Sequence, residues 1–335
     1  MCVLGNGVLV HYLTADRSPT NDQPTNHPSA HPTLNQPKHT QMLFTMELDA
    51  EVLRAFVQEA RVLYSLRRHP NLLRCLGVAI MPPAACLVTE YCQGGSLFEV
   101  LREEREGDGG AGAQEEQHDA AATRRQWRHA LLASYPARLR LMVDCAAGVA
   151  HLHRHGLVHG DIKSLNFLLT GEGAVKLGDV GEARPAGARP PDGGPVHPTT
   201  INWAPPEVLS LAAGAYHPSM DMYSLGLVLN EVLTLEVPFH RPPYTTWGYQ
   251  DLIAHIVGGG RPPLGTDTDL GGAAEGLRPA LEACLDGDSA LRPTAQNLHA
   301  MLKEQYERVG GGGRGDGDDE DDDEDEEAES GKAAV

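Results

Sequence analysis

The segment LVHGDIKSLNFLL, residues 157 to 169, places three polar side chains of different chemistry between two apolar runs. Asp161, Lys163 and Asn166 fall within six positions, and Asp179 follows thirteen residues later in LGDVG. Phosphoryl transfer needs oxygen ligands for a metal ion, a cation against the phosphate, and a carboxylate that orients the attacking hydroxyl. These four residues supply all of those groups, so their spacing predicts a phosphate-handling site.

The alternative for each residue is a structural role. An isolated Asp-x-Lys-x-x-Asn is usually a solvated loop, and Asp179 at this spacing is what favours a site. His159 is better explained as a core histidine that supports the loop than as a metal ligand. The histidines of HLHRHG, at positions 151, 153 and 155, lie at a predicted helix end, where imidazoles interact favourably with the helix dipole.

The pattern of apolar residues predicts the main elements around this segment. Apolar residues recur with helical spacing over 53–64 and 137–155, and MYSLGLVLNEVLTL (222–235) is apolar nearly all round, as in a helix buried on every side. Residues 72–80 and 85–91 are typical of two strands, followed by a Gly-Gly joint. A strand-and-helix piece therefore precedes a larger helical piece, which predicts an α+β fold with two lobes.

The chain divides into four predicted regions. Residues 1–40 are expected to be a disordered or spurious segment, because 14–40 are rich in Pro, Asn, Thr and His. Residues 41–92 form a partial small lobe. Residues 93–308 form the large lobe, with a low-complexity surface insertion at about 102–130. Residues 309–335 form an acidic tail with the charge pattern of a disordered segment.

The tail dominates the charge of the chain. Residues 310–335 hold twelve acidic and two basic residues, so they carry −10 of the formal net charge of −19. The remaining body is mildly acidic without a basic stripe, which argues against nucleic acid as a partner. The tail is either a solubilising segment or a docking segment for a basic partner.

No apolar run is long enough to span a membrane, and the six scattered cysteines suggest reduced thiols in the cytosol.

Taken in order, several motifs resemble the eukaryotic protein kinase family over about residues 41 to 306. HGDIKSLN is similar to the kinase catalytic loop, and DVG to the Asp-Phe-Gly motif. The further matches are Glu59 in FVQEARVL, the segment HPNLLRCLGV, LVTEYCQGGSL, WAPPE with Glu207, the buried helix that begins at Asp221, and Arg292 in LRP. Lys163 with SLN and Thr200 favour the Ser/Thr kinases of the tyrosine-kinase-like group.

The resemblance implies a role for each matched residue, with ATP and Mg²⁺ as cofactors and a protein as substrate. Asp161 is the expected base, Lys163 a phosphate contact, and Asn166 with Asp179 the metal ligands. The expected nucleotide contacts are Glu59, Thr89 (the residue before the inter-lobe joint), the backbones of Glu90 and Cys92, and Leu168. Glu207 with Arg292 is expected to be a structural ion pair, and Asp221 to hold the backbone of the loop.

Three departures from the family pattern matter. Gly160 replaces an Arg, so activity should depend little on phosphorylation of Thr199 or Thr200. Val180 replaces the Phe of Asp-Phe-Gly. The Gly-rich loop and the strand with a Val-Ala-x-Lys pattern are missing before Glu59, where position 41 is Gln; LGNG at 4–7 is a weak hint of the loop. Either the small lobe has lost its first strands or, as favoured here, residues 1–41 are not the genuine N-terminus.

Two functions follow from these observations. The first is a protein serine/threonine kinase. The second is a catalytically impaired pseudokinase that serves as a scaffold, which the absent lysine favours. Retention of Asp161, Asn166 and Asp179 favours catalysis, because acids clustered in a cleft repel one another without a cation.

Overall fold

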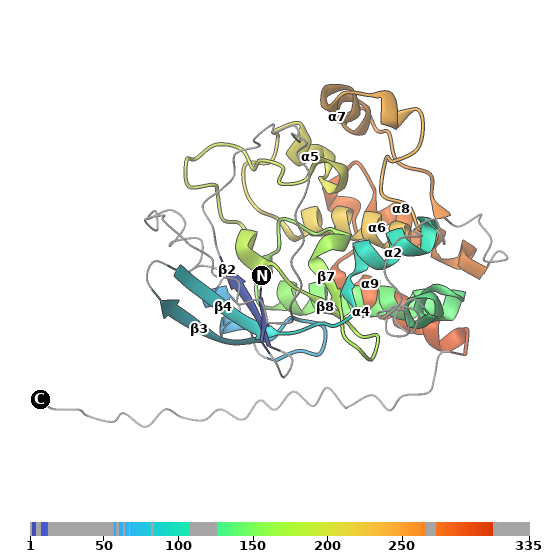
Figure 1. Ribbon diagram of the computed structural model, residues 1–335. Coiled ribbons are helices and arrows are strands. Elements are labelled where there is room, and N and C mark those ends of the chain that lie inside the picture. The colour runs from blue at the N-terminus through green and yellow to red at the C-terminus, as the bar shows by residue number, and fades with distance from the viewer. Residues whose placement is uncertain are drawn as a thin grey trace, which may run out of the picture.

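The computed structural model describes residues 2–4, 8–12, 57, 60–62, 64–66, 68–81, 84–106, 126–265 and 273–310. These residues form a small lobe built on a four-stranded sheet and a larger lobe built mainly of helices (Figure 1). The predicted two-lobed α+β fold is confirmed. The part of the chain that the structure describes contains no helix with both the length and the apolar character needed to cross a bilayer.

The small lobe is an antiparallel sheet with the strand order β1-β2-β4-β3. Its strands are β1 (Cys2–Leu4), β2 (Val8–Tyr12), β3 (Cys75–Met81) and β4 (Ala84–Glu90). The strands β3 and β4 are the two predicted from residues 72–91. Residues 57, 60–62 and 64–65 are helical, within the helix predicted over 53–64.

The strands β1 and β2 lie within residues 1–40, where the composition predicts disorder, so the structure differs from the expectation for these two stretches. The consecutive apolar residues Val8, Leu9 and Val10, two of them β-branched, follow a Gly-Asn-Gly sequence, which favours a strand after a turn. The partner of β2 is β4, with Leu9 opposite Thr89. A pairing across such a sequence distance leaves no local signal.

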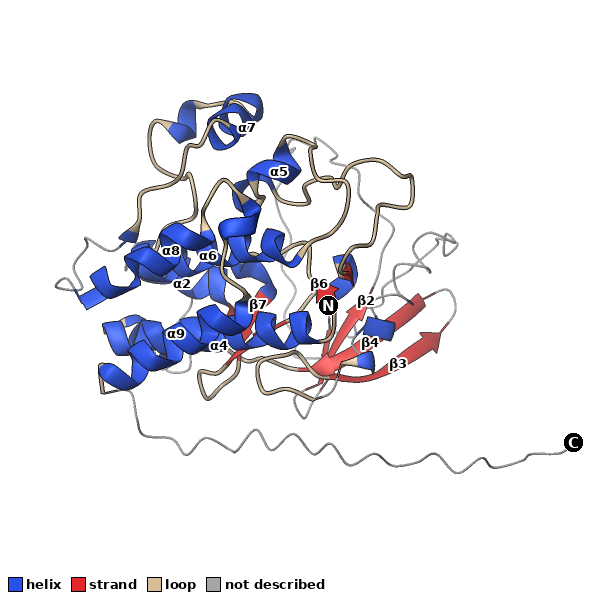
Figure 2. Ribbon diagram, turned by 180° about the vertical axis from the view of Figure 1, so that it is seen from behind, coloured by secondary structure: helices blue, strands red, loops and turns tan. Residues whose placement is uncertain are grey.

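The helices of the large lobe surround one apolar core (Figure 2). They are α2 (Leu97–Glu106), α4 (Tyr135–Arg154), α5 (Pro206–Leu209), α6 (Pro218–Thr234), α7 (Tyr249–Val257), α8 (Arg278–Cys284) and α9 (Ala295–Arg308). Short 3-10 helices occur at Ser164–Asn166, Val180–Glu182, Ile201–Trp203, Tyr244–Thr246, Ala273–Leu277 and Ser289–Leu291.

The two long helices α4 and α6 follow the predicted patterns. The N-terminus of α4 is capped by Ser134, whose hydroxyl accepts a hydrogen bond from the backbone N–H of Ala137. Gly148 of α4 lies so close to Asn71 that a Cβ there would come within 2.6 Å of the Asn71 carbonyl oxygen, so a glycine is required for this contact between the lobes. The helix α6 is buried from Ser219 to Leu233, as its all-round apolar sequence predicts.

The predicted insertion at 102–130 is narrower than expected. Residues 102–106 belong to α2, and residues 126–132 are helical as well, with Leu132 fully buried in the core. The charged residues of α2 obscure its apolar face in the sequence, because Leu97, Val100 and Leu101 alone point into the core. Residues 107–125 lie outside the described part of the chain.

Short strands frame the segment with the predicted site residues. The pairs are β6 (Leu157–Val158) with β9 (Arg184–Pro185), and β7 (Phe167–Leu169) with β5 (Gly95–Ser96) and β8 (Val175–Leu177). Asp161, Lys163 and Asn166 lie in the loop between β6 and β7, and Asp179 lies between β8 and β9. The sheet β5-β7-β8 therefore brings the two halves of the predicted site to one end of adjacent strands.

Candidate active site

The loop that carries Asp161 is held from below by a carboxylate of α6. The Oδ2 atom of Asp221 accepts hydrogen bonds from the backbone N–H of His159 at 2.7 Å, and Oδ1 accepts one from Gly160 N–H at 2.9 Å. The Nε2 atom of His153 lies 2.7 Å from the same Oδ2. Burial acts to raise the pKa of Asp221, but His153, the charge of His159 and the Gly160 N–H together hold it below its usual value. The predicted role of Asp221 is confirmed.

The residues on either side of this anchor explain the turn of the loop. Gly160 has φ +78°, a left-handed conformation that suits glycine and strains other residues. His159 is fully buried, and its ring nitrogens lie 3.1 Å from the Gly178 carbonyl oxygen and 3.3 Å from the backbone N–H nitrogen of Asp161. The predicted supporting role of His159 is confirmed, because it ties the loop to the strand that leads into Asp179.

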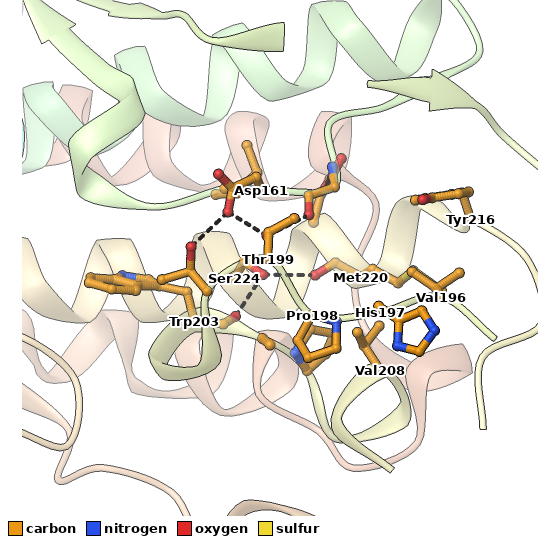
Figure 3. Close-up of a pocket in the computed structure, with 16 residues that line it drawn as sticks. Asp161, Val196, His197, Pro198, Thr199, Trp203, Val208, Tyr216, Met220 and Ser224 are labelled. Atoms are coloured by element: carbon orange, nitrogen blue, oxygen red, sulfur yellow. Dashed lines mark hydrogen bonds between the residues drawn. The ribbon is translucent and has the colours of Figure 1, made fainter. Parts of the chain in front are cut away.

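Asp161 lies at the centre of a compact polar cluster. Its Oδ2 atom accepts a hydrogen bond from Lys163 Nζ at 2.5 Å. Its Oδ1 atom accepts hydrogen bonds from the hydroxyls of Thr199 at 2.6 Å and Thr200 at 3.0 Å (Figure 3). The structure thus brings Asp161, Lys163 and the threonines together, and the carboxylate is fully engaged with donors, including a hydroxyl of the kind a substrate presents.

The oxygen atoms of Asn166 and Asp179 fit a hard divalent cation. The Nδ2 atom of Asn166 donates to the Asp161 carbonyl oxygen at 2.8 Å, which orients the amide, and within the described residues no hydrogen bond engages its Oδ1 atom. The backbone of the next strand is tied to this residue, since Gly178 N–H donates to the Asn166 carbonyl oxygen at 2.8 Å. Asp179 follows Gly178 directly, is exposed, and has φ +52°. Carboxylate and amide oxygens are ligands that Mg²⁺ accepts.

The predicted nucleotide contacts lie at the joint between the lobes. Thr89 is 1% exposed, and its hydroxyl has no hydrogen-bond partner in the described part of the chain, so it offers a polar atom to a bound group. The Glu90 carboxylate accepts from Arg74 N–H at 2.8 Å and lies 3.0 Å from Lys176 Nζ, so this side chain fastens the joint. The side chain of Leu168 packs near Gly178. Glu59 lies outside the described residues.

One buried acid beneath the loop was missed by the sequence reasoning. The Oε1 atom of Glu231 accepts from the Ser164 hydroxyl at 3.0 Å, and Oε2 accepts from Trp203 Nε1 at 2.6 Å. Burial raises the pKa of Glu231 to about 8, although both hydrogen bonds act to lower it. Glu231 is therefore protonated near neutral pH and links α6, the loop and Trp203 without a charge.

A Glu231→Gln substitution tests this protonation. The pKa of about 8 in the folded protein lies above the ordinary value of 4.5, so this group stabilises the protein most below pH 4.5, and its contribution is lost as the pH rises towards 8. The glutamine amide has one hydrogen-bond acceptor and donor N–H groups, as the protonated carboxyl group of Glu231 has one carbonyl acceptor and one O–H donor. We expect Glu231→Gln to raise the free energy of unfolding at pH 7.5 by on the order of 1–3 kcal/mol and to have little effect at pH 4.5. Urea unfolding at both pH values measures this; an equal effect at both would contradict a titrating Glu231.

The fold and this constellation define a class of protein, and sequence comparison places the chain within it. Residues 40–302 match the family described as "Protein tyrosine and serine/threonine kinase". The chain belongs to this family, and the predicted resemblance is confirmed.

Similar proteins include three with kinase names. "Serine/threonine-protein kinase STY17" of Arabidopsis thaliana is 27% identical over 78% of this chain and 39% of its own length. "Probable serine/threonine-protein kinase drkA" of Dictyostelium discoideum is 30% identical over 74% and 33%, respectively. "Mitogen-activated protein kinase kinase kinase 4" of Mus musculus is 30% identical over 76% and 14%. The chain thus spans well under half the length of each of these relatives.

Proposed function

We propose that this protein is a protein serine/threonine kinase that uses Mg-ATP. The observation that carries the proposal is the cluster of Asp161, Lys163 and Asn166, with the residue before Asp179 hydrogen-bonded to Asn166. Residue types that suit a base, a phosphate contact and metal ligands meet there. The names of the similar proteins and the residues Lys163 and Thr200 favour Ser and Thr over Tyr as acceptors. We also propose a cytosolic location, which suits cysteines such as Cys92, Cys145 and Cys284 that form no disulfide within the described residues.

In this mechanism each residue of the candidate site has a separate role. Asp161 orients the acceptor hydroxyl and takes its proton, and Lys163 neutralises charge on the transferred phosphoryl group. Asn166 and Asp179 would hold Mg²⁺, which when bound neutralises charge on the phosphates. Thr89, Leu168 and the backbones of Glu90 and Cys92 would bind the adenine side of ATP. Asp221 and His159 hold Asp161 in position.

A second candidate is a scaffold with impaired catalysis, and one observation favours it. The strand β2 precedes the helical residues 57, 60–62 and 64–65 in the chain and pairs with β4, although it lies well before position 41, where the family resemblance places the lysine. The residues of β2 are Val-Leu-Val-His-Tyr, so His11 is its only basic residue.

A His11→Lys substitution separates these candidates further. If His11 stands where the resemblance predicts lysine, the new ammonium gains a hydrogen bond to the nucleotide phosphates worth ~1.5–3 kcal/mol. We expect kcat/KM for ATP to rise about 10- to 100-fold. His240→Lys, at an exposed position of the large lobe, is the control. Equal activity of the His11→Lys variant and the wild type would show that β2 does not replace the missing strand.

The decisive experiment for the proposed function has two parts. The thermal midpoint is measured with and without Mg-ATP, and transfer of labelled γ-phosphate to Ser, Thr and Tyr peptides is measured with and without EDTA. A kinase gives a Mg-dependent shift and label on Ser or Thr peptides. Stabilisation without transfer would support the scaffold, and the absence of both would overturn both candidates.

Docking of the acidic tail on a basic partner stays a prediction, because residues 311–335 lie outside the described part.

A further inference from the structure

The joint between the lobes, at Gly94 and Gly95, is supported by a helix that follows the predicted insertion. This helix covers residues 126–132, and two of its side chains, Trp127 and Arg128, reach the joint. Trp127 is partly buried and packs against the core of the large lobe. A Cβ at Gly94 would come within 2.8 Å of the Trp127 ring, so the indole lies directly against the backbone of the joint.

Arg128 ties this helix to the joint by a hydrogen bond. Its Nη2 atom donates to the Gly94 carbonyl oxygen at 2.8 Å, and its Nη1 atom forms an ion pair with Glu103 of α2. Arg128 is only 8% exposed, so water competes poorly for this bond. Hydrogen bonds from charged donors are stronger than those between neutral groups, so this contact fixes the orientation of the Gly94 peptide.

The second glycine of the joint leaves room for this arginine. Gly95 has φ +77°, and a Cβ there would lie 3.1 Å from Arg128 Nη2 and 2.5 Å from Glu99 Oε2. The same Glu99 oxygen accepts a hydrogen bond from the backbone N–H of Ser96 at 2.9 Å, at the start of α2. Arg128 and the first turn of α2 therefore both restrain the backbone of the joint.

Stability alone does not explain an arginine at this position. Burial of a charge costs solvation that its partners repay only in part, and the Arg128 Nε atom has no hydrogen-bond partner among the described residues. Its contacts connect instead to the proposed nucleotide site, because the Gly95 N–H donates to the Cys92 carbonyl oxygen at 3.3 Å. A joint that is already held loses less conformational entropy when a nucleotide binds to both lobes.

We propose that Arg128 is a positioning residue for nucleotide binding, which acts through the Gly94 carbonyl group; this inference rests on the proposed kinase function. Arg128 does not touch the nucleotide in this role. It restrains the joint in the conformation that presents the backbones of Glu90 and Cys92 to adenine. Its loss therefore weakens ATP binding and leaves the transfer step at Asp161 unchanged.

The test is Arg128→Met in the full chain, since methionine keeps an unbranched side chain but removes the donor and the charge. We expect KM for ATP to rise about tenfold with kcat within about twofold of the wild type, because a hydrogen bond from a charged group is lost. Hydrogen exchange of the backbone at 93–96, measured without nucleotide, should become about tenfold faster for the same reason. Arg128→Lys keeps a charged donor and should restore most of both values.

Arg261→Met is the matched control. Arg261 also donates to backbone carbonyl oxygens, among them those of Ile256 and Leu285, but none of its acceptors belongs to the joint. This control should lower the thermal midpoint and leave KM and the exchange at the joint unchanged. Glu103→Gln is a second variant that preserves the core, because the Glu103 side chain is 55% exposed. It removes the ion pair of Arg128 and should raise KM and the exchange rate about 2- to 5-fold.

Two results would overturn the proposal and leave the kinase function intact. One is a folded Arg128→Met protein in which KM for ATP and the exchange at 93–96 equal those of the wild type, or in which only kcat falls. The other is an equal change of both values in Arg261→Met, since that would show a general loss of stability. If Arg128→Met does not fold, unchanged values in Glu103→Gln overturn the proposal. Absence of ATP binding by the wild type would overturn the proposed function together with this inference.

Discussion

An Asp161→Asn variant should lose phosphoryl transfer by about 10²- to 10⁴-fold while it still binds Mg-ATP. The amide is nearly the same size as the carboxylate, and its oxygen can still accept from the Thr199 and Thr200 hydroxyls, whereas its nitrogen cannot accept from Lys163 Nζ. The loop keeps its backbone hydrogen bonds to Asp221, which hold its shape. The amide has no capacity to take a proton from an acceptor hydroxyl, which is the role proposed for Asp161. The rate constant for peptide phosphorylation and the thermal shift with Mg-ATP measure the two effects separately.

The matched control is Asp192→Asn. Asp192 is exposed, lies in the connection that leads to Thr199, and accepts a hydrogen bond from the backbone N–H of Gly194 at 3.0 Å. This control should transfer phosphate at the wild-type rate. If Asp161→Asn retained transfer within about twofold of the wild type, the assignment of Asp161 as the base would be wrong. If it lost the Mg-ATP shift as well, the defect would lie in binding or folding.

A Glu207→Ala variant should lose about 3–5 kcal/mol of stability, the cost of leaving a buried charge without its partner. Arg292 binds Glu207 in a bidentate pair, with Nη1 2.7 Å from Oε1 and Nη2 2.8 Å from Oε2. The Arg292 side chain is 0% exposed and also lies over the ring of Tyr223, so the substitution leaves a buried guanidinium without its carboxylate. The pair joins the start of α5 to the segment before α9, as predicted from the sequence.

Thermal unfolding measures this loss. For a domain of this size we expect the midpoint to fall by roughly 6–20 °C, from the stability loss and the usual entropy of unfolding. Glu304→Ala is the control, because it breaks a pair in which Arg308 and Glu304 are 63% and 71% exposed. Such a surface pair contributes ~0–1 kcal/mol. A Glu207→Ala midpoint no lower than that of Glu304→Ala would show that the buried pair contributes little.

The parts of the fold that the sequence predicted are those with dense local signals. The helix α6 is apolar on every face and α4 has a regular apolar stripe, so both were predicted within a few residues of their true bounds, although the serine cap of α4 was not recognised. The loop at 159–166 was found because residues that suit a base, a metal ligand and a phosphate contact fall close together in the chain.

The parts that were missed depend on partners far apart in the sequence. The strand β2 is stabilised by pairing with β4, and the sequence near residue 8 does not indicate which strand it pairs with. Glu231 looks like one polar residue in an apolar helix, and only the fold brings Ser164 and Trp203 to its two oxygens. The hydrogen bond from Thr199 to Asp161 likewise depends on how the connection from β9 to α5 folds back over the loop.

The most direct test of the account is the position of a metal ion in crystals grown with Mn²⁺ and a non-hydrolysable ATP analogue, located by its anomalous scattering. Mn²⁺ prefers the same oxygen ligands as Mg²⁺. The account predicts a manganese ion bound by Asp179 and the Asn166 amide oxygen, beside the phosphates and next to Asp161. A nucleotide bound without the metal at these residues, or a metal bound elsewhere in the chain, would contradict it.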